Sequence, residues 1–294
     1  MDENYSLYYE LLLRMDYDQI LDFGTHLRTD NVLNEIIQRI VADNNFWYRK
    51  LSMEIKTYND PSVNWTRAYK FFQSGLHHDQ LLVDVSQSGW LPEVQLLLLN
   101  GADPRVEENA PIIWASINGH LAIVNRLLQD PRVDPSSQNN DAIVGASGKG
   151  HLAVVNRLLE DERVDPSAWN NFVLIQASTN GHLAIVDRLL QDPRVDPSAQ
   201  DNDAIVWASK FGHLAVVNRL LKDSRVDPSA QDNASIIEAS RNGRLAVVNR
   251  LLQDERVDPS AQDNPALKEA SRNGHIAVVN RLMQDEKVAH GGEH

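Results

Sequence analysis

The chain has 294 residues, of which 42% are apolar, so it is long enough for two domains or for one extended array with a buried core. Its net charge of −13 argues against binding to nucleic acid phosphates or to an anionic membrane surface, because both need a basic patch. The absence of cysteine excludes disulfides and thiolate metal sites and fits a reducing compartment.

The N-terminal stretch "MDENYSLYYELLLRMDYD" is acidic, and Arg14 and Asp16 interrupt its apolar run, so it does not have the pattern of a signal peptide. The longest apolar run, "VQLLLL", is too short to span a bilayer. We therefore expect an intracellular, cytoplasmic protein. All seven tyrosines lie at or before Tyr69, whereas an internal repeat is clear from about residue 80. This shift predicts a helical domain at 1–60, a linker with a short helix at 61–79 and a repeat array at 80–294.

Residues 1–60 have a helical period and resemble an F-box domain. The segment "ELLLRMDYDQIL" is similar to the opening E-L-L-x-x-L-D-x-x-D-L-L of that family, and "ADNNFWYRKL" to its closing D-x-x-L-W-x-x-L. The leading L-P pair of the family is replaced by "LYY". The resemblance implies a substrate receptor of a cullin–RING ubiquitin ligase that binds a Skp1-type adaptor and has no chemistry of its own. The implied contact residues are Leu11, Leu12, Met15, Ile20, Leu21 and Trp47. The alternative is a helical cap that seals the open end of the array.

The array is anchored by glycines at a fixed spacing. The first step is 30 residues and the next five are 31 residues each, which is typical of a solenoid. No unit of this length can bury its apolar face alone, so we expect the units to be stabilised by stacking on their neighbours. The glycines are Gly89, Gly119, Gly150, Gly181, Gly212, Gly243 and Gly274.

Each unit is predicted to contain two short helices. In "DAIVWASKF" the residues Ile205, Ala208 and Ser209 share a face, which is expected to be buried. In "HLAVVNRLLKD" the apolar positions i, i+3 and i+7 predict a packed face, and Ala208 and Ala215 are small enough for close helix approach. Those three positions are Leu214, Val217 and Leu221.

A glycine and a proline separate the predicted elements. Gly212 is expected to end the first helix in a left-handed conformation, which glycine adopts without steric penalty. Asp227 and Pro228 in "RVDPSAQDN" predict a turn that returns the chain to the next unit.

The repeat resembles the ankyrin repeat. "GHLAVVNRLL" is similar to the second-helix signature of that family, and "LLLLNGADP" at 96–104 to its standard unit ending. The usual T-P-L-H is absent, and the G-A-D ending becomes longer by one residue, as in "PRVDP". The connection to the next unit is about three residues shorter than in the family. We therefore expect compact turns in place of the projecting hairpin fingers of the family.

The segment "NWTRAYKFF" in the linker is similar to the short helix that follows F-box-like domains in ankyrin proteins of large DNA viruses and their protist hosts. For a viral protein the expected location is the host cytoplasm.

Three positions of the first helix differ from unit to unit, whereas its alanine and serine hardly vary. They are the residue before the alanine and those two and three after it, which form one stripe opposite the packed face. In ankyrin proteins that side is the concave groove that binds partners. The stripes are Trp114, Ile117, Asn118; Gly145, Gly148, Lys149; Gln176, Thr179, Asn180; Trp207, Lys210, Phe211; Glu238, Arg241, Asn242; and Glu269, Arg272, Asn273.

Aromatic residues are rare after residue 80, and most of them lie on or next to these stripes. Clustered exposed aromatic residues on a rigid surface suit binding hot spots. The alternative is that each tryptophan packs over the turn of a neighbouring unit. The predicted partner-binding residues are Trp114, Trp169, Phe172, Trp207, Lys210 and Phe211.

Signals for chemistry are weak. "HGGEH" at 290–294 matches a zinc-peptidase signature, but its two glycines and the chain end disfavour the helix that the signature needs. "GASGKGH" lacks the spacing of a phosphate loop. A histidine follows the anchoring glycine in most units, which suits a structural role. We therefore predict an all-α, non-catalytic protein with no cofactor or metal. The alternative to the ligase adaptor is a plain scaffold whose N-terminal helices only cap the solenoid.

Overall fold

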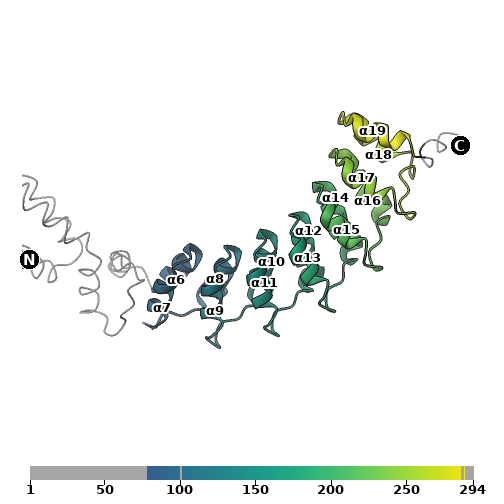
Figure 1. Ribbon diagram of the computed structural model, residues 1–294. Helices are drawn as coiled ribbons and strands as arrows, with labels where there is room; N and C mark the ends of the chain where they lie inside the picture. The colour runs from purple at the N-terminus through teal and green to yellow at the C-terminus, as the bar shows by residue number, and fades with distance from the viewer. Residues whose placement is uncertain (1–77, 100, 286–287, 289–294) are drawn as a thin grey trace, which may run out of the picture. The chain divides into compact units, whose positions relative to one another are not determined.

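The computed structural model describes residues 78–99, 101–285 and 288, and every regular element in these residues is a helix (Figure 1). The helices come in pairs that follow the sequence repeat, which confirms the predicted all-α solenoid. The pairs are α6 (His78–Ser88) and α7 (Leu91–Leu99), α8 (Val106–Ile117) and α9 (Leu121–Leu127), α10 (Ser137–Lys149) and α11 (Leu152–Leu158), α12 (Ala168–Thr179) and α13 (Leu183–Leu189), α14 (Ala199–Phe211) and α15 (Leu214–Leu220), α16 (Ala230–Arg241) and α17 (Leu245–Leu251), and α18 (Pro265–Arg272) and α19 (Ile276–Met283). The domain predicted at 1–60 lies outside the described residues.

The chain divides into two compact regions, each larger than a single repeat unit. The first contains α6, α7, the part of α8 up to Ile112, and residues 126–133. In it, Leu81 and Leu82 of α6 are fully buried, and Asp79 Oδ1 accepts a hydrogen bond of 2.6 Å from the backbone N–H of Asp103. The second region contains residues 113–125 and the chain from Asp134 onward, including α10 to α19.

In the second region the helices form two layers. The first helix of each pair packs on the first helices of its neighbours, in the order α10, α12, α14, α16 and α18. The second helices α11, α13, α15, α17 and α19 pack on one another in the same order. Each inner pair therefore lies between two similar pairs, and the layers share a continuous core.

The core of the first-helix layer is as predicted: Ile205, Ala208 and Ser209 are each 0% exposed. Of the expected face of the second helix, Val217 is confirmed, whereas Leu214 and Leu221 were wrong. Val216, Val217 and Leu220 are buried, whereas Leu214 and Leu221 are half-buried and Ala215 is exposed. The reason is that α15 has only seven residues, so Leu214 and Leu221 lie at its two ends. The inward face is then set by its middle turn.

Two features of the structure require glycine at anchoring positions of the repeat. Gly212 has φ 84° and its backbone N–H bonds to the carbonyl of Ala208, which confirms the predicted left-handed helix end. In addition, the next unit packs closely on the five glycines from Gly119 to Gly243. A Cβ on Gly181, for example, would lie 2.5 Å from Nδ1 of His213, which is far closer than any normal contact. Only glycine satisfies both the backbone and the neighbour.

The units are joined by one turn of left-handed helix. Gln200, Asp201 and Asn202 all have positive φ, at 52°, 53° and 67°. The same three-residue turn recurs within the first residues of α8, α10, α12, α14 and α16, and directly before α18. The predicted compact turn is therefore present, but its conformation is unusual because left-handed residues cost about 1–2 kcal/mol each and seldom occur in succession. Asparagine and aspartate, which tolerate this conformation best, fill most of these positions.

A buried asparagine links each left-handed turn to the next unit. Asn202 is 7% exposed, and its Oδ1 accepts a hydrogen bond of 2.7 Å from the backbone N–H of Asp227, in the following turn. Asn140, Asn171 and Asn233 do the same for the units beside it. These bonds satisfy a part-buried donor and stabilise the turn at the same time.

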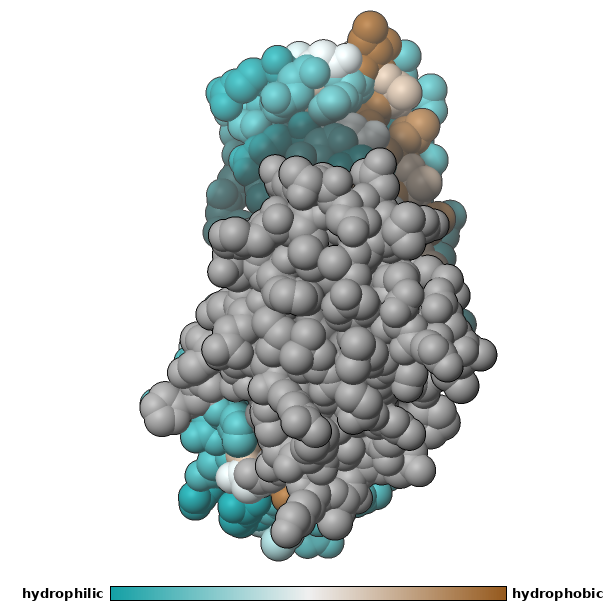
Figure 2. All heavy atoms as spheres, turned by 90° about the vertical axis from the view of Figure 1, so that its left-hand side faces the viewer, coloured by the Kyte–Doolittle hydropathy of each residue, from teal (hydrophilic) through white to brown (hydrophobic). Residues whose placement is uncertain are grey.

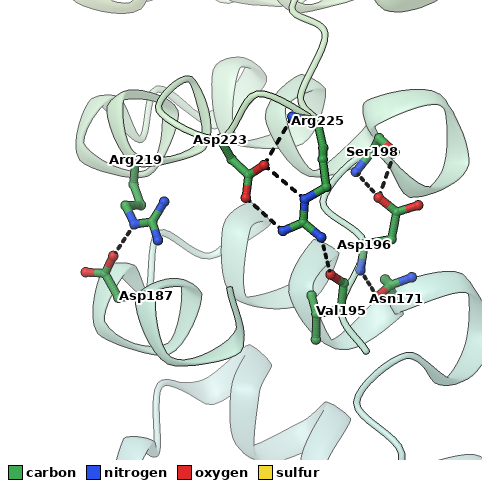
Figure 3. A network of polar contacts seen from close by, with 8 residues as sticks. All are labelled: Asn171, Asp187, Val195, Asp196, Ser198, Arg219, Asp223 and Arg225. Carbon is green, nitrogen blue, oxygen red and sulfur yellow. Dashed lines mark hydrogen bonds and ion pairs between the residues drawn. The ribbon is translucent and has the colours of Figure 1, made fainter. Parts of the chain in front are cut away.

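Arginine side chains add a second link between units (Figure 3). Arg225 forms a two-pronged ion pair with Asp223, at 3.0 and 2.8 Å, and donates a further bond of 2.9 Å to the carbonyl of Val195 in the preceding unit. The hydrogen bond from Arg225 lowers the pKa of Asp223. Arg194 and Arg256 make the equivalent contacts in neighbouring units. The recurrence of "RVDP" from unit to unit therefore has a structural reason.

In the described residues, α19 is the last helix of the second-helix layer. Ile276 is 72% exposed and Met283 is 61% exposed, whereas the corresponding Leu245 and Leu252 of the preceding pair are half-buried. Figure 2 shows hydrophobic residues gathered along one side of an otherwise hydrophilic surface, at the height of the C-terminal pairs.

Candidate partner-binding face

The three variable positions of each first helix lie on one side of the first-helix layer, which we call the first-helix face. None of these residues is buried from α8 to α18, whereas the alanines beside them are 0% exposed. The face is therefore accessible along its length. Its composition changes along the array: aromatic at α14, small at α10, and charged at α16 and α18.

Four aromatic residues of α12 and α14 form an aromatic cluster on this face. Trp169 is 60% exposed and Phe211 43% exposed, while Phe172 and Trp207 are half-buried. The rings of Trp169 and Phe172 are 6.1 Å apart, and those of Trp207 and Phe211 are 6.2 Å apart and stacked. Such aromatic pairs provide rigid apolar surface for binding.

Trp114 of α8 is also exposed, at 38%, but it makes no ring contact with this cluster. Of the six residues predicted for the groove, the structure thus brings five together and leaves Trp114 apart. The fifth is Lys210, whose Nζ lies 4.5 Å from the centre of the Trp207 ring and 3.8 Å from Glu238.

Trp207 separates two clefts on the first-helix face. One, of about 250 Å³, lies between α12 and α14 and is lined by Phe172, Ile175 and Gln176 among others. The other, of about 210 Å³, lies between α14 and α16 and is lined by Val206, Lys210, Ala234 and Glu238 among others. Both are smaller than the sites that enclose drug-sized ligands, so they suit single side chains of a protein partner.

Glutamines at one position of two left-handed turns donate hydrogen bonds to the preceding turn. Gln231 Nε2 donates a bond of 3.0 Å to the carbonyl of Asp201 in the preceding turn, and Gln200 reaches the carbonyls of Trp169 and Asn170 at 3.4 Å. Trp169 stands at the same position, with φ 53°, and cannot make this amide contact. A bulky residue with positive φ in an exposed position carries a local cost without a packing gain, which is typical of a functional position.

The glycines of α10 differ in their surroundings. A Cβ on Gly145 would lie 2.3 Å from Cγ1 of Ile117, so this glycine is needed for packing. A Cβ on Gly148 would meet nothing closer than Gln176 Oε1 at 3.5 Å. Gly148 therefore has no steric reason to be glycine, and it leaves the backbone of α10 open to the close approach of a partner.

We expect Gly148→Ala to raise the free energy of unfolding by about 0.5–1 kcal/mol, because alanine favours the helix over glycine. Gly145→Ala should lower it, because the added Cβ collides with Ile117. Urea denaturation of the two variants measures both effects, and Gly145→Ala/Ile117→Ala should recover part of the loss from the clash. A destabilising Gly148→Ala would contradict this interpretation.

The histidines that follow the anchoring glycines bond to backbone. His182 Nε2 lies 3.1 Å from the carbonyl of Gly148, His213 Nε2 lies 2.9 Å from that of Thr179, and His275 Nε2 lies 2.9 Å from that of Arg241. Arg244 replaces the histidine in one unit and makes the same contact to Lys210. This supports the structural role expected from the sequence.

Within the described residues there is no group of three or more histidine, cysteine, aspartate or glutamate side chains that could hold a metal ion. The same residues contain no helix long and apolar enough to cross a membrane. The "HGGEH" segment lies outside them, as do the residues predicted to contact a Skp1-type adaptor: Leu11, Leu12, Met15, Ile20, Leu21 and Trp47.

Comparison of the units by sequence missed Asp203, which lines both clefts. Its position was not among the three variable ones, yet it also differs between units, and Phe172 occupies it in the preceding unit. A comparison that included the residue after the left-handed turn would have found it.

No curated protein sequence matches the chain. Among solved structures, it is similar to the human ASB11 ankyrin repeat domain, with a TM-score of 0.55 and 19% identity, over 68% of this chain and 96% of that one. A family model described as "Ankyrin repeats (3 copies)" matches residues 82–168, 143–232 and 205–290, which together span more than two thirds of the sequence. The chain belongs to the ankyrin-repeat family.

Proposed function

We propose that this protein binds a protein partner on the first-helix face and presents it to a Skp1/cullin-type ubiquitin ligase in the cytoplasm. Ankyrin repeats are protein–protein interaction modules, and the family match supports a non-catalytic role. The observation that carries the proposal is the aromatic cluster of Trp169, Phe172, Trp207 and Phe211, which is partly exposed beside two clefts of side-chain size.

The rest of the array supports this assignment by contrast. The Arg–Asp pairs, the buried asparagines and the backbone-bonded histidines all hold one unit to the next. The aromatic cluster departs from the repeat, and Trp169 stands at the position where Gln200 and Gln231 bond to the preceding turn. A position that abandons a structural contact for an exposed ring suits recognition better than scaffolding.

The ligase part of the proposal rests on the F-box-like sequence at 1–60. Size-exclusion chromatography of the purified full chain with Skp1 tests it: we expect co-elution that is lost in Trp47→Ala and Leu21→Asp. The double variant Trp207→Ala/Phe211→Ala serves as the control, because its changes lie on the first-helix face and should leave co-elution intact. No co-elution of the parent chain would leave the plain scaffold with an N-terminal helical cap as the function.

A further inference from the structure

Asp203 is the acidic residue common to the two clefts. It is the first residue after the left-handed turn of α14, and it lines the cleft on each side of Trp207. At the corresponding position the two neighbouring units have Phe172 and Ala234, so among these three units only this one carries a carboxylate there; Asp141 of α10 is the other acidic residue at this position of the repeat. Any side chain that enters either cleft therefore meets the same negative charge.

In the part of the chain that the structure describes, Asp203 forms no ion pair, unlike Glu238 and Asp223. Its Oδ1 accepts a hydrogen bond of 2.9 Å from Gln231, and no cationic side chain in the described residues lies within ion-pair distance of it. By contrast, Glu238 is paired with both Lys210 and Arg241, and Asp223 is paired with Arg225. The charge of Asp203 is uncompensated in the free protein.

The walls beside Asp203 suit a cation with an apolar stem. The cleft between α12 and α14 is lined by Phe172, Ile175 and Trp207, which can pack against methylene groups. The Trp207 ring already attracts one cation, Lys210, at 4.5 Å. An uncharged apolar side chain in this cleft would instead remove water from the carboxylate without a compensating bond.

We propose that the partner inserts an arginine or lysine side chain beside Asp203, with its stem against Phe172 and Trp207. This inference rests on the proposed function and names the chemistry of the partner: a basic segment that carries apolar residues next to the cation. The net charge of −13 favours such a partner over an acidic one. Because the clefts are small, recognition depends on a few side chains and not on a broad basic surface.

A phage-displayed library of random twelve-residue peptides, selected on the full chain, tests the inference. We expect selected peptides to contain arginine or lysine next to aromatic or aliphatic residues. Replacing the arginine by neutral citrulline should weaken binding by about 10–100-fold, as expected for a charge-assisted hydrogen bond. Asp203→Asn should weaken the binding of the arginine peptide by a similar factor. It should leave the affinity for the citrulline peptide almost unchanged, because the two changes remove the same contact.

The variants separate this inference from the proposed function. Asp203→Asn keeps an acceptor for Gln231, so the fold is preserved, and Asp201→Asn, in the adjacent turn, is the matched control that should leave affinity unchanged. Affinity that depends on Trp207 but not on Asp203 would overturn the inference alone. Affinity that depends on neither would overturn both the inference and the proposed binding face. Selection of peptides without a basic residue would also overturn the inference.

Discussion

Replacing Asn202 by alanine is expected to lower the free energy of unfolding by about 2–5 kcal/mol. The change leaves the part-buried backbone N–H of Asp227 without its acceptor, which costs about 1–3 kcal/mol. It also places alanine at φ 67°, a left-handed conformation that costs about 1–2 kcal/mol for a residue other than glycine, asparagine or aspartate. Both terms act at one junction between units, so chemical denaturation should show the full loss.

Asn202→Asp is the control for this effect. The aspartate keeps an oxygen acceptor at the same place, and Asp79 already makes the equivalent bond to Asp103 in the first pair. We expect this variant to lose less than half as much stability as Asn202→Ala. Equal losses in the two variants would mean that the amide–backbone bond is not what stabilises the junction.

The double change Trp207→Ala/Phe211→Ala is expected to weaken partner binding strongly with little loss of stability. Both rings are at least partly exposed and stack on each other, so they contribute more to a bound partner than to the core. Loss of two hot-spot aromatic residues should weaken the binding of a selected peptide by at least about 2 kcal/mol, which is roughly 30-fold in affinity. Isothermal titration calorimetry measures the affinity, and thermal unfolding of the same samples measures the stability.

Ile276→Ala/Met283→Ala is the matched control for this prediction. It removes two exposed apolar side chains from α19, in the second-helix layer and away from the first-helix face. This variant should bind the peptide as the parent does. A large drop in melting temperature for the Trp207/Phe211 variant would instead identify those rings as packing residues, which is the alternative that the sequence left open.

Much of the fold could be predicted because the repeat compares the chain with itself. The glycine spacing predicted the units, and the invariance of alanine and serine predicted the buried side of the first helix. The predicted face of α15 was right only at Val217, because residue periodicity assumes a helix longer than its seven residues. Leu214 and Leu221 look equivalent to Val217 in the sequence, but only the helix ends decide which of them turn inward.

The conformation of the left-handed turns could not be predicted from the sequence, for a different reason. "SAQDN" indicates a polar turn, and Asn202 alone suggests one residue with positive φ. Three in succession persist only because Asn202 bonds to Asp227, 25 residues further along the chain, and because the next unit holds that backbone in place. Similarly, the pairing of Asp203 depends on Gln231 of the following unit. Contacts across units are set by stacking and not by local sequence.

Binding at the first-helix face is tested most directly by hydroxyl-radical footprinting of the full chain with and without a selected peptide. Trp169 and Phe211 are 60% and 43% exposed in the free protein, so both should be oxidised readily. On binding, their oxidation should fall several-fold, while that of Met283, which is 61% exposed on α19, should stay the same. Unchanged oxidation of Trp169 and Phe211 in the saturated complex would contradict binding at this face.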